Sequence, residues 1–390
     1  MTLRRTILKT MMGAGLAAAL AGPTLAQEPI RIGLILPMTG PFTSTGRQIS
    51  AAVNLYVQQN GATIAGRPVQ VILRDDTGVA DVTRRIAQEL IVNEKVTAIA
   101  GFGLTPLALA TAPLATQAKT PMVVMAAATS VIVDRSPFVV RTSQVVPQIA
   151  GPFGTWIAQQ GTKRVITIVS DYAPGHDVET SFSQAFRDAG GQVENIRVPL
   201  QNPDFSPFLQ RVADAKPEAL LVFVPSGVGA QFMKQFVERG MDKTGIRLIG
   251  TGDVTDDDIL NGMGDAAMGV VTAHHYSAAH PSPKNKAFVE AFAKANNNMR
   301  PNFMALGGYD GMHALYEGLK KTNGQGGEAL VEAMKGLSWE SPRGPISIDA
   351  QTRDIIQNVY VRRVERVNGE LFNVEFHTIP NVRDPSKPAR

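Results

Sequence analysis

Two threonines and an aspartate follow short apolar, β-branched runs, at the points where those runs end. Thr105 and Thr129 come after residues 97–100 and 121–124, and Asp253 comes after a third such run. If the runs are parallel strands, these side chains lie where strand-end loops lead into helix starts, whose unpaired N–H groups attract anions. A threonine hydroxyl can donate to a carboxylate, and an aspartate can accept from an amine. The pattern predicts a non-covalent site for a small carboxylate-bearing molecule.

Each of these residues also has a structural alternative. The two threonines can simply cap their helices. Thr255 followed by the acidic run 256–258 indicates a helix cap with an acidic first turn, which the helix dipole favours. We therefore assign the run 256–258 to capping and Asp253 to the ligand site.

No combination of residues indicates catalysis or a metal centre. The chain has no cysteine, which excludes disulfides, thiolate metal sites and a cysteine nucleophile. His274, His275 and His280 lack an accompanying acidic or helical ligand pattern, so we assign them a structural role. Ser226 has no local sign of a base, and no Gly-x-Ser-x-Gly elbow occurs. We expect no cofactor, no metal and no enzymatic activity.

Strand-like apolar runs alternate with amphipathic helical patterns, which predicts an α/β protein with parallel sheets covered on both faces. The first series has strands at 30–36, 69–73, 97–100 and 121–124, with helices at 49–57, 79–93 and 106–118. The second has strands at 164–169, 192–198, 219–224 and 247–250, with helices at 147–160, 175–189, 205–215 and 228–240. Helices at 284–297, 303–321 and 327–335 and strands at 345–348, 357–364 and 371–376 complete the chain. Because no low-complexity linker separates the series, we expect two lobes joined by short hinge strands.

The first 26 residues are typical of an export signal. Basic residues within 4–9 precede an apolar run at 11–22 that is too short to span a bilayer, and residues 24–26 offer a cleavage site. The twin arginines leave the twin-arginine and general secretory routes both open. Removing the three cations of this segment lowers the net charge from +4 to +1, which does not favour a nucleic-acid partner. We expect a free periplasmic protein, cleaved near Ala26.

Several short motifs occur in a characteristic order over nearly the whole mature chain. They are Ile32-Gly33-Leu34-Ile35-Leu36-Pro37-Met38-Thr39-Gly40-Pro41, Asp75-Asp76, Gly101-Phe102-Gly103-Leu104-Thr105, Pro121-Met122-Val123-Val124-Met125-Ala126-Ala127-Ala128-Thr129, Ser170-Asp171-Tyr172-Ala173-Pro174-Gly175, Gly308-Tyr309-Asp310 and Arg343-Gly344-Pro345. In them the sequence resembles the branched-chain amino-acid-binding family of periplasmic transport receptors, which have the type I periplasmic binding protein fold. The resemblance implies two doubly wound parallel-sheet lobes joined by three hinge crossings. Lobe 1 would comprise 27–142 plus 276–352 and lobe 2 would comprise 143–275 plus 353–390, with the ligand in the cleft between them.

The resemblance also assigns roles within the cleft. In the family, the positions of Thr105 and Thr129 and the Ala127 backbone hold the ligand carboxylate, and an acidic residue at the position of Asp253 binds its ammonium group. The predicted ligand-binding residues are Thr45, Thr105, Ala127, Ala128, Thr129, Tyr172, Ser226 and Asp253.

Three wall positions differ from the family pattern. Pro174 replaces an aromatic residue before the loop glycine, Thr45 stands where an aromatic residue is frequent, and Ser226 stands where a tyrosine is common. Tyr172 can still cover the ligand with an aromatic face. Because smaller wall residues leave more volume, an organic acid with an aromatic or aliphatic tail competes with an amino acid as the expected ligand.

The function implied by the resemblance is that of the solute-binding component of an ABC importer. The closed, ligand-bound form would dock on a membrane permease driven by an ATPase, and a monomer suits the hinge motion. A binding protein that feeds a signalling receptor and a secreted hydrolase are the alternatives.

Overall fold

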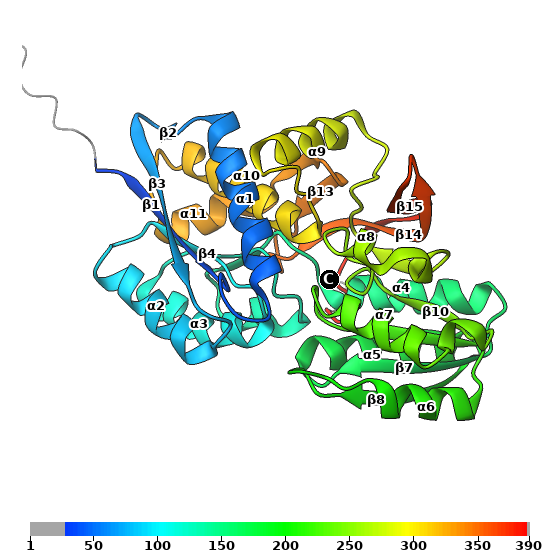
Figure 1. The fold of residues 1–390 in the computed structure, drawn as a ribbon. Helices are drawn as coiled ribbons and strands as arrows, with labels where there is room; N and C mark the ends of the chain where they lie inside the picture. The colour runs from blue at the N-terminus through cyan, green and yellow to red at the C-terminus, as the bar shows by residue number, and fades with distance from the viewer. Residues whose placement is uncertain (1–27, 388–390) are drawn as a thin grey trace, which may run out of the picture.

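Two α/β lobes make up the protein, whose computed structural model describes residues 28–387 (Figure 1). In that view one lobe lies to the left and the other to the lower right. The predicted signal segment 1–26 and its cleavage near Ala26 lie outside the described residues. Among the residues that the structure describes, no helix has the length and apolar character needed to cross a membrane.

The first lobe is built on a six-stranded sheet in the order β2-β3-β1-β4-β5-β6, parallel except for the β2–β3 pair. Its strands are β1 (Ile30–Leu36), β2 (Thr63–Ile64), β3 (Arg67–Asp75), β4 (Ala98–Gly101), β5 (Met122–Val124) and β6 (Val139–Arg141). Its helices are α1 (Thr43–Asn60), α2 (Ala80–Val92), α3 (Thr105–Ala118), α9 (Pro283–Ala295), α10 (Phe303–Lys321) and α11 (Gly327–Met334). One continuous apolar core joins the strands to these helices, because the central strands are buried on both faces.

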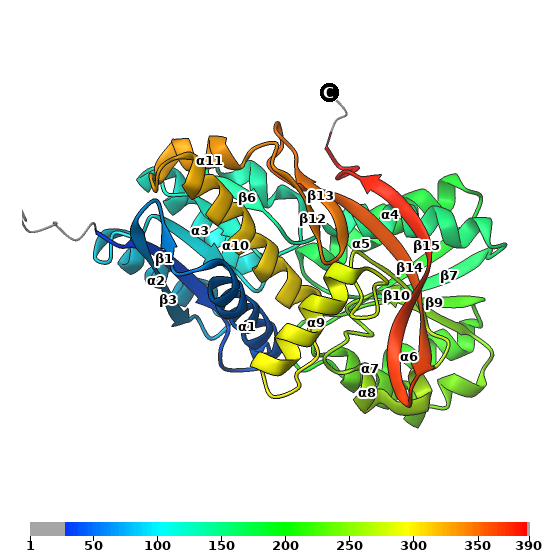
Figure 2. The same cartoon turned by 90° about the horizontal axis from the view of Figure 1, so that it is seen from above.

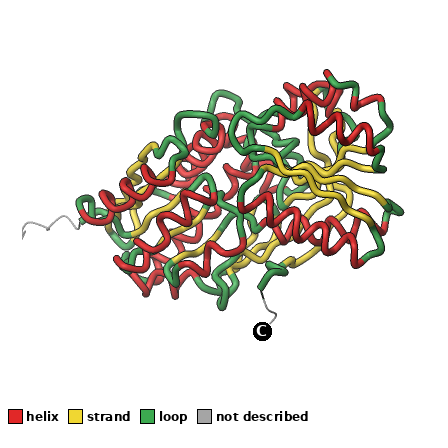
Figure 3. The backbone as a smooth tube through the Cα atoms, turned by 90° about the horizontal axis from the view of Figure 1, so that it is seen from below, coloured by secondary structure: helices red, strands yellow, loops and turns green. Residues whose placement is uncertain are grey.

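The second lobe is built on a nine-stranded sheet in the order β12-β13-β14-β11-β10-β9-β7-β8, with β15 also paired to β14. Its strands are β7 (Arg164–Ser170), β8 (Gln192–Val198), β9 (Ala219–Phe223), β10 (Arg247–Thr251), β11 (Val271–His274), β12 (Ser338–Ser341), β13 (Gly344–Ile348), β14 (Ile355–Val367) and β15 (Glu370–Val382). Its helices are α4 (Val146–Gln159), α5 (Ala173–Asp188), α6 (Ser206–Ala215), α7 (Gly229–Glu238) and α8 (Leu260–Met263). Helices flank the strands in both lobes (Figure 3), which confirms the predicted fold class.

A β-hairpin belongs to both lobes. The hairpin β12–β13 extends the second sheet through the pairing of Ser347 and Ile348 with β14, while Trp339 and Ile348 pack on the core of the first lobe. Seen from above, the long β14–β15 ribbon runs from this hairpin along the second lobe (Figure 2). The polypeptide therefore passes between the lobes three times, after β6, after β11 and between β13 and β14.

Fully buried arginines hold the first and third of these crossings together. Arg141 pairs with Asp354 at 2.8 Å, so that the end of β6 is joined to the segment before β14. Arg343 pairs with Asp310 of α10 at 2.9 Å and donates to the carbonyl of Thr142 at 2.6 Å. A buried guanidinium is tolerated only when it is paired and hydrogen-bonded, so these contacts fix where the crossings lie.

A further buried arginine contacts the second crossing from β14. Arg362 of β14 donates to Thr272 at 3.1 Å and to the carbonyl of Tyr276, which follows β11. Each crossing is thus held by an arginine that contacts backbone or side chains of a different segment.

We predict that Arg343→Met lowers the free energy of unfolding by about 3 kcal/mol or more, because it leaves the buried Asp310 carboxylate without its ionic partner. Arg366, which is 45% exposed and pairs with Asp265 at the surface, supplies the control. Arg366→Met should cost less than about 1 kcal/mol. Denaturant titration of both variants measures the difference. Equal losses would contradict a holding role for Arg343.

Candidate ligand-binding site

A cavity lies between the two lobes, at the ends of β4, β5, β7, β9 and β10. The cavity is narrow, with about 30 Å³ open to the centres of water-sized molecules, within about 390 Å³ of space that no atom fills and that includes its opening. The first lobe contributes Phe42, Thr45, Gly103, Leu104, Thr105, Ala126, Ala127, Ala128 and Met304, and the second contributes Tyr172, Pro174, Phe223, Pro225, Ser226 and Asp253. Gln144, in the first crossing between the lobes, completes the lining. Thus seven of the eight predicted residues line one cavity, and Thr129 does not.

The start of α3 faces this cavity with an unpaired hydroxyl. No side chain caps the helix, and Thr105 Oγ1 is buried without a hydrogen-bond partner in residues 28–387. The chain reaches this helix through Phe102, whose φ of 67° is strained for a non-glycine residue, and through Gly103. A Cβ on Gly103 would lie 2.8 Å from Pro37, so only glycine permits this approach. The result is a helix start at which the Thr105 hydroxyl and the positive end of the helix dipole both face the cavity.

In the loop after β5, Ala127 and Thr129 form hydrogen bonds within the protein, whereas the sequence predicted that they hold the ligand carboxylate. The Ala127 N–H donates to the Phe102 carbonyl at 3.0 Å, and the Thr129 hydroxyl donates to Asp177 of α5. Asp177 also accepts from the Ser130 N–H at 3.1 Å. Thr129 therefore joins the two lobes beside the cavity, and a role for it in holding the ligand stays a prediction.

Aromatic rings and two polar groups form the second-lobe wall. The rings of Tyr172 and Phe223 lie nearly parallel, with centroids 6.1 Å apart. Burial, with a smaller contribution from Asp253, raises the pKa of Tyr172 well above its ordinary value, so the phenol stays neutral. Ser226 Oγ is buried without a partner among the described residues. Asp253 Oδ2 accepts from Thr251 at 3.0 Å.

The interpretation of the acidic run 256–258 as a helix cap is wrong. The helix that follows, α8, begins only at Leu260 and has no acidic residue in its first turn. Instead, Asp258 accepts from Ser44 and from Arg47 of α1, at 3.0 Å for the latter, and so joins the lobes at the rim of the cleft. The partner residues are more than two hundred positions away, and no local signal could identify them.

Sequence reasoning also missed apolar and polar members of the wall. Phe42, Leu104, Met304 and Phe223 line the cavity, and Gln144 carries a buried Oε1 with no partner in the described chain. Of these residues, only Gln144 could have been found from the sequence, because it lies in a crossing between the lobes and a crossing must pass the cleft.

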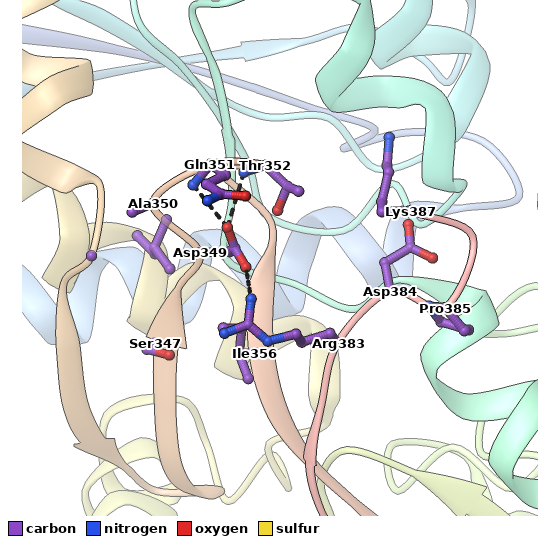
Figure 4. A pocket seen from close by; sticks show the side chains of 12 residues that line it. Ser347, Asp349, Ala350, Gln351, Thr352, Ile356, Arg383, Asp384, Pro385 and Lys387 are labelled. Carbon is purple, nitrogen blue, oxygen red and sulfur yellow. Dashed lines mark hydrogen bonds and ion pairs between the residues drawn. The ribbon is translucent and has the colours of Figure 1, made fainter. Parts of the chain in front are cut away.

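A separate open depression lies where the β13–β14 connection meets the C-terminal segment (Figure 4). Asp349 accepts there from the N–H groups of Gln351 and Thr352, at 2.8 and 3.0 Å, and from Arg383. Its acidic group is thus paired within the protein, and none of the predicted site residues lines it.

Comparison with known proteins identifies the class of protein. The family model described as periplasmic binding protein matches residues 29–370. The chain therefore belongs to the periplasmic binding protein family, in the branch of solute-binding proteins of ABC transporters, as its motifs predicted. This class of protein binds solutes and is not a class of enzymes.

Three relatives are informative. A Leu/Ile/Val-binding protein homolog 6 of Brucella melitensis biotype 1 is 41% identical over 378 residues, covering 95% of this chain and 97% of the relative. A solute-binding protein of an ABC transporter from Rhodopseudomonas palustris BisB5, in complex with 3,4-dihydroxybenzoic acid, is 59% identical with a TM-score of 0.91 and covers 93% and 99% of the two chains. A counterpart from Rhodopseudomonas palustris HaA2, in complex with p-hydroxybenzoic acid, is 38% identical with a TM-score of 0.89 over 92% and 99%.

Two buried imidazoles lie behind the second-lobe wall. Burial lowers the pKa of His274 from 6.5 to about 4 and that of His275 well below its ordinary value. His274 Nε2 lies 3.6 Å from Asp253 Oδ2. Both rings are therefore neutral in the folded protein near neutral pH, whereas in the unfolded chain they bind protons below about pH 6.5.

We predict that this difference costs stability as the pH falls from about 6.5 to 4, by about 3 kcal/mol for His274. The sign follows because the unfolded state binds more protons in this window. Buried Asp256, whose pKa burial raises, acts in the opposite direction, so the comparison is between His274→Gln and wild type. The variant should lose less stability over this window, measured by denaturant titration at several pH values. His377→Gln, which replaces a histidine with an exposed ring, is the control variant. A variant profile parallel to that of wild type would contradict the prediction.

Proposed function

We propose that this protein is the periplasmic solute-binding component of an ABC importer that captures a small aromatic carboxylate of the hydroxybenzoate class. The observation that carries the proposal is the unpaired Thr105 hydroxyl at the uncapped start of α3, which faces a cavity with aromatic walls.

The start of α3 supports a carboxylate as the ligand's anionic group. Pro106 has no N–H, and the Leu107 and Ala108 N–H groups donate to the Leu104 carbonyl at 3.1 and 3.3 Å, so the positive end of the helix dipole is what this helix start contributes to an anion. The Thr105 hydroxyl adds one donor.

The remaining walls support an aromatic ligand body. Phe42, Leu104 and Met304 from one lobe oppose Tyr172 and Phe223 from the other. Flat rings stack well on such walls and lose little conformational entropy on binding. The relatives bound to dihydroxybenzoic and hydroxybenzoic acids, at 59% and 38% identity, favour the same ligand class over an aliphatic amino acid.

Capture would proceed by closure of the two lobes, for which we retain the limits 27–142 plus 276–352 and 143–275 plus 353–390. A ligand shifts an open–closed equilibrium only through contacts that are better in the closed form. The Asp258 and Asp177 contacts between the lobes would form on closure, as would simultaneous contact of the ligand with both walls. The closed protein, as a monomer, would then deliver its ligand to a permease and its ATPase, after export and cleavage near Ala26.

We predict that Thr105→Val weakens binding of 4-hydroxybenzoate by about 1.5 to 3 kcal/mol, because a hydrogen bond to a charged group is lost. Isothermal titration calorimetry measures the dissociation constant. Thr111→Val on the same helix is the matched control, since Thr111 is buried but donates only to the Leu107 carbonyl. Thr105→Ser should retain most of the affinity. Unchanged affinity in Thr105→Val would refute the assignment of this residue.

We also predict that Asp258→Ala weakens binding by about 0.5 to 1 kcal/mol without any change at the cavity wall, because a rim contact of the closed form is lost. The double variant with Arg47→Ala should show less than the sum of the two single effects. Arg74→Ala is the control, because Arg74 pairs with Glu94 within the first lobe. Small-angle scattering of the ligand-free Asp258→Ala protein should show a larger radius of gyration. If the two single effects on binding add fully and the radius of gyration is unchanged, Asp258 has no role in closure.

A further inference from the structure

We infer that Asp253 and Ser226 select ligands that carry hydroxyl groups on the ring edge opposite the carboxylate. This inference rests on the proposed function and assigns the second-lobe wall a role in specificity.

Asp253 disfavours an anionic group of the ligand at the second-lobe wall. It lies in the cavity wall at 4% exposure and is the one acidic side chain among the described residues that line the cavity. A ligand carboxylate would be repelled here, whereas a group with a hydrogen to donate is attracted. The carboxylate end of the ligand therefore belongs at Thr105, on the opposite lobe, and a donor belongs at Asp253.

The loop that carries Asp253 is held rigidly. Thr251 donates to Oδ2 at 3.0 Å, and His274 lies behind the same oxygen. A Cβ on Gly252 would lie 2.1 Å from an Arg362 nitrogen and 2.6 Å from His274 Cγ, so this loop packs directly on both side chains. The carboxylate is thereby oriented before a ligand arrives, which favours selective recognition.

Ser226 supplies a second polar group next to Asp253. Ser226 is 2% exposed, and its Oγ has no hydrogen-bond partner in the described chain. Ser226 follows β9 and Asp253 follows β10, and these strands are parallel neighbours in the sheet. Neighbouring strands lie about 4.8 Å apart, so the two side chains can reach adjacent hydroxyls of one ring.

The same wall suits a hydroxyl better than an ammonium group. An ammonium has three hydrogens to donate and needs acceptors on several sides. Around Asp253 the second-lobe lining offers one carboxylate and the hydroxyls of Ser226 and Tyr172, with Pro174, Phe223 and Pro225 forming the apolar remainder of this wall, so it holds a single charged acceptor. A phenolic hydroxyl needs one acceptor for its hydrogen, which Asp253 provides. This assigns Asp253 a different partner from the ammonium group that the sequence resemblance implied.

The test is a calorimetric panel of benzoate, 4-hydroxybenzoate, 3,4-dihydroxybenzoate and leucine against wild type, Asp253→Ala, Asp253→Asn and Ser226→Ala. Wild type should bind 4-hydroxybenzoate more tightly than benzoate. Asp253→Ala should lose about 10- to 100-fold in affinity for 4-hydroxybenzoate and change little for benzoate, because only the hydroxyl loses its acceptor. Asp253→Asn should retain part of the preference. Ser226→Ala should reduce the affinity for 3,4-dihydroxybenzoate more than that for 4-hydroxybenzoate.

Thr105→Val separates this inference from the proposed function, because it should weaken all three benzoates alike. If Asp253→Ala weakens benzoate and 4-hydroxybenzoate equally, the selection role is overturned and the proposed function stands. If Asp253→Ala abolishes leucine binding and leaves the benzoates unchanged, the ammonium role is restored and the inference fails. If wild type binds no benzoate, the proposed function itself fails. Melting curves confirm that each variant is folded, and Asp253→Asn carries the test if Asp253→Ala does not fold.

Discussion

The geometry of this protein depends on arginine side chains buried where the chain passes between its lobes. A guanidinium keeps its charge in a protein, so it must be paired and hydrogen-bonded once it leaves water. Arg141, Arg343 and Arg362 meet this requirement with carboxylate, hydroxyl and carbonyl oxygens of several crossing segments. The crossings are therefore tied to one another, and the relative position of the lobes follows from a few buried polar contacts.

The same arginines support the cavity walls. Arg141 donates to the Thr129 carbonyl at 2.8 Å, in the loop that follows β5 on the first lobe. Arg362 packs against Gly252, directly before Asp253 on the second lobe. One wall of each lobe is thus anchored to the hinge, so the polar groups that face a ligand are oriented by contacts outside the cavity. Such support preorganises a binding site built on loops.

Features whose cause is local in the chain could be predicted from the sequence. The strand β9 is a continuous apolar run and β1 is apolar except at Arg31, as expected for strands buried on both faces. The site position of Thr105 could be predicted because it follows a strand and a glycine and begins a helix. The strand β11, with its mixed sequence, was missed because its neighbours in the sheet define it. Asp258 was misassigned because its partner Ser44 is 214 residues away, whereas capping was the better local explanation.

Under the proposed function, the selectivity of the cavity would follow from the polar atoms that it leaves unpaired. Thr105, Gln144 and Ser226 each carry a buried oxygen without a partner in residues 28–387. Such an atom costs about 1 to 3 kcal/mol unless a ligand or water pairs with it. An apolar molecule of suitable size leaves this cost in place, whereas a ligand whose polar groups match the wall removes it on closure. Under the proposed function, the closed state would therefore depend on the chemistry of the ligand as well as its volume, and the wall residues, more than the fold, would decide which ligand is bound.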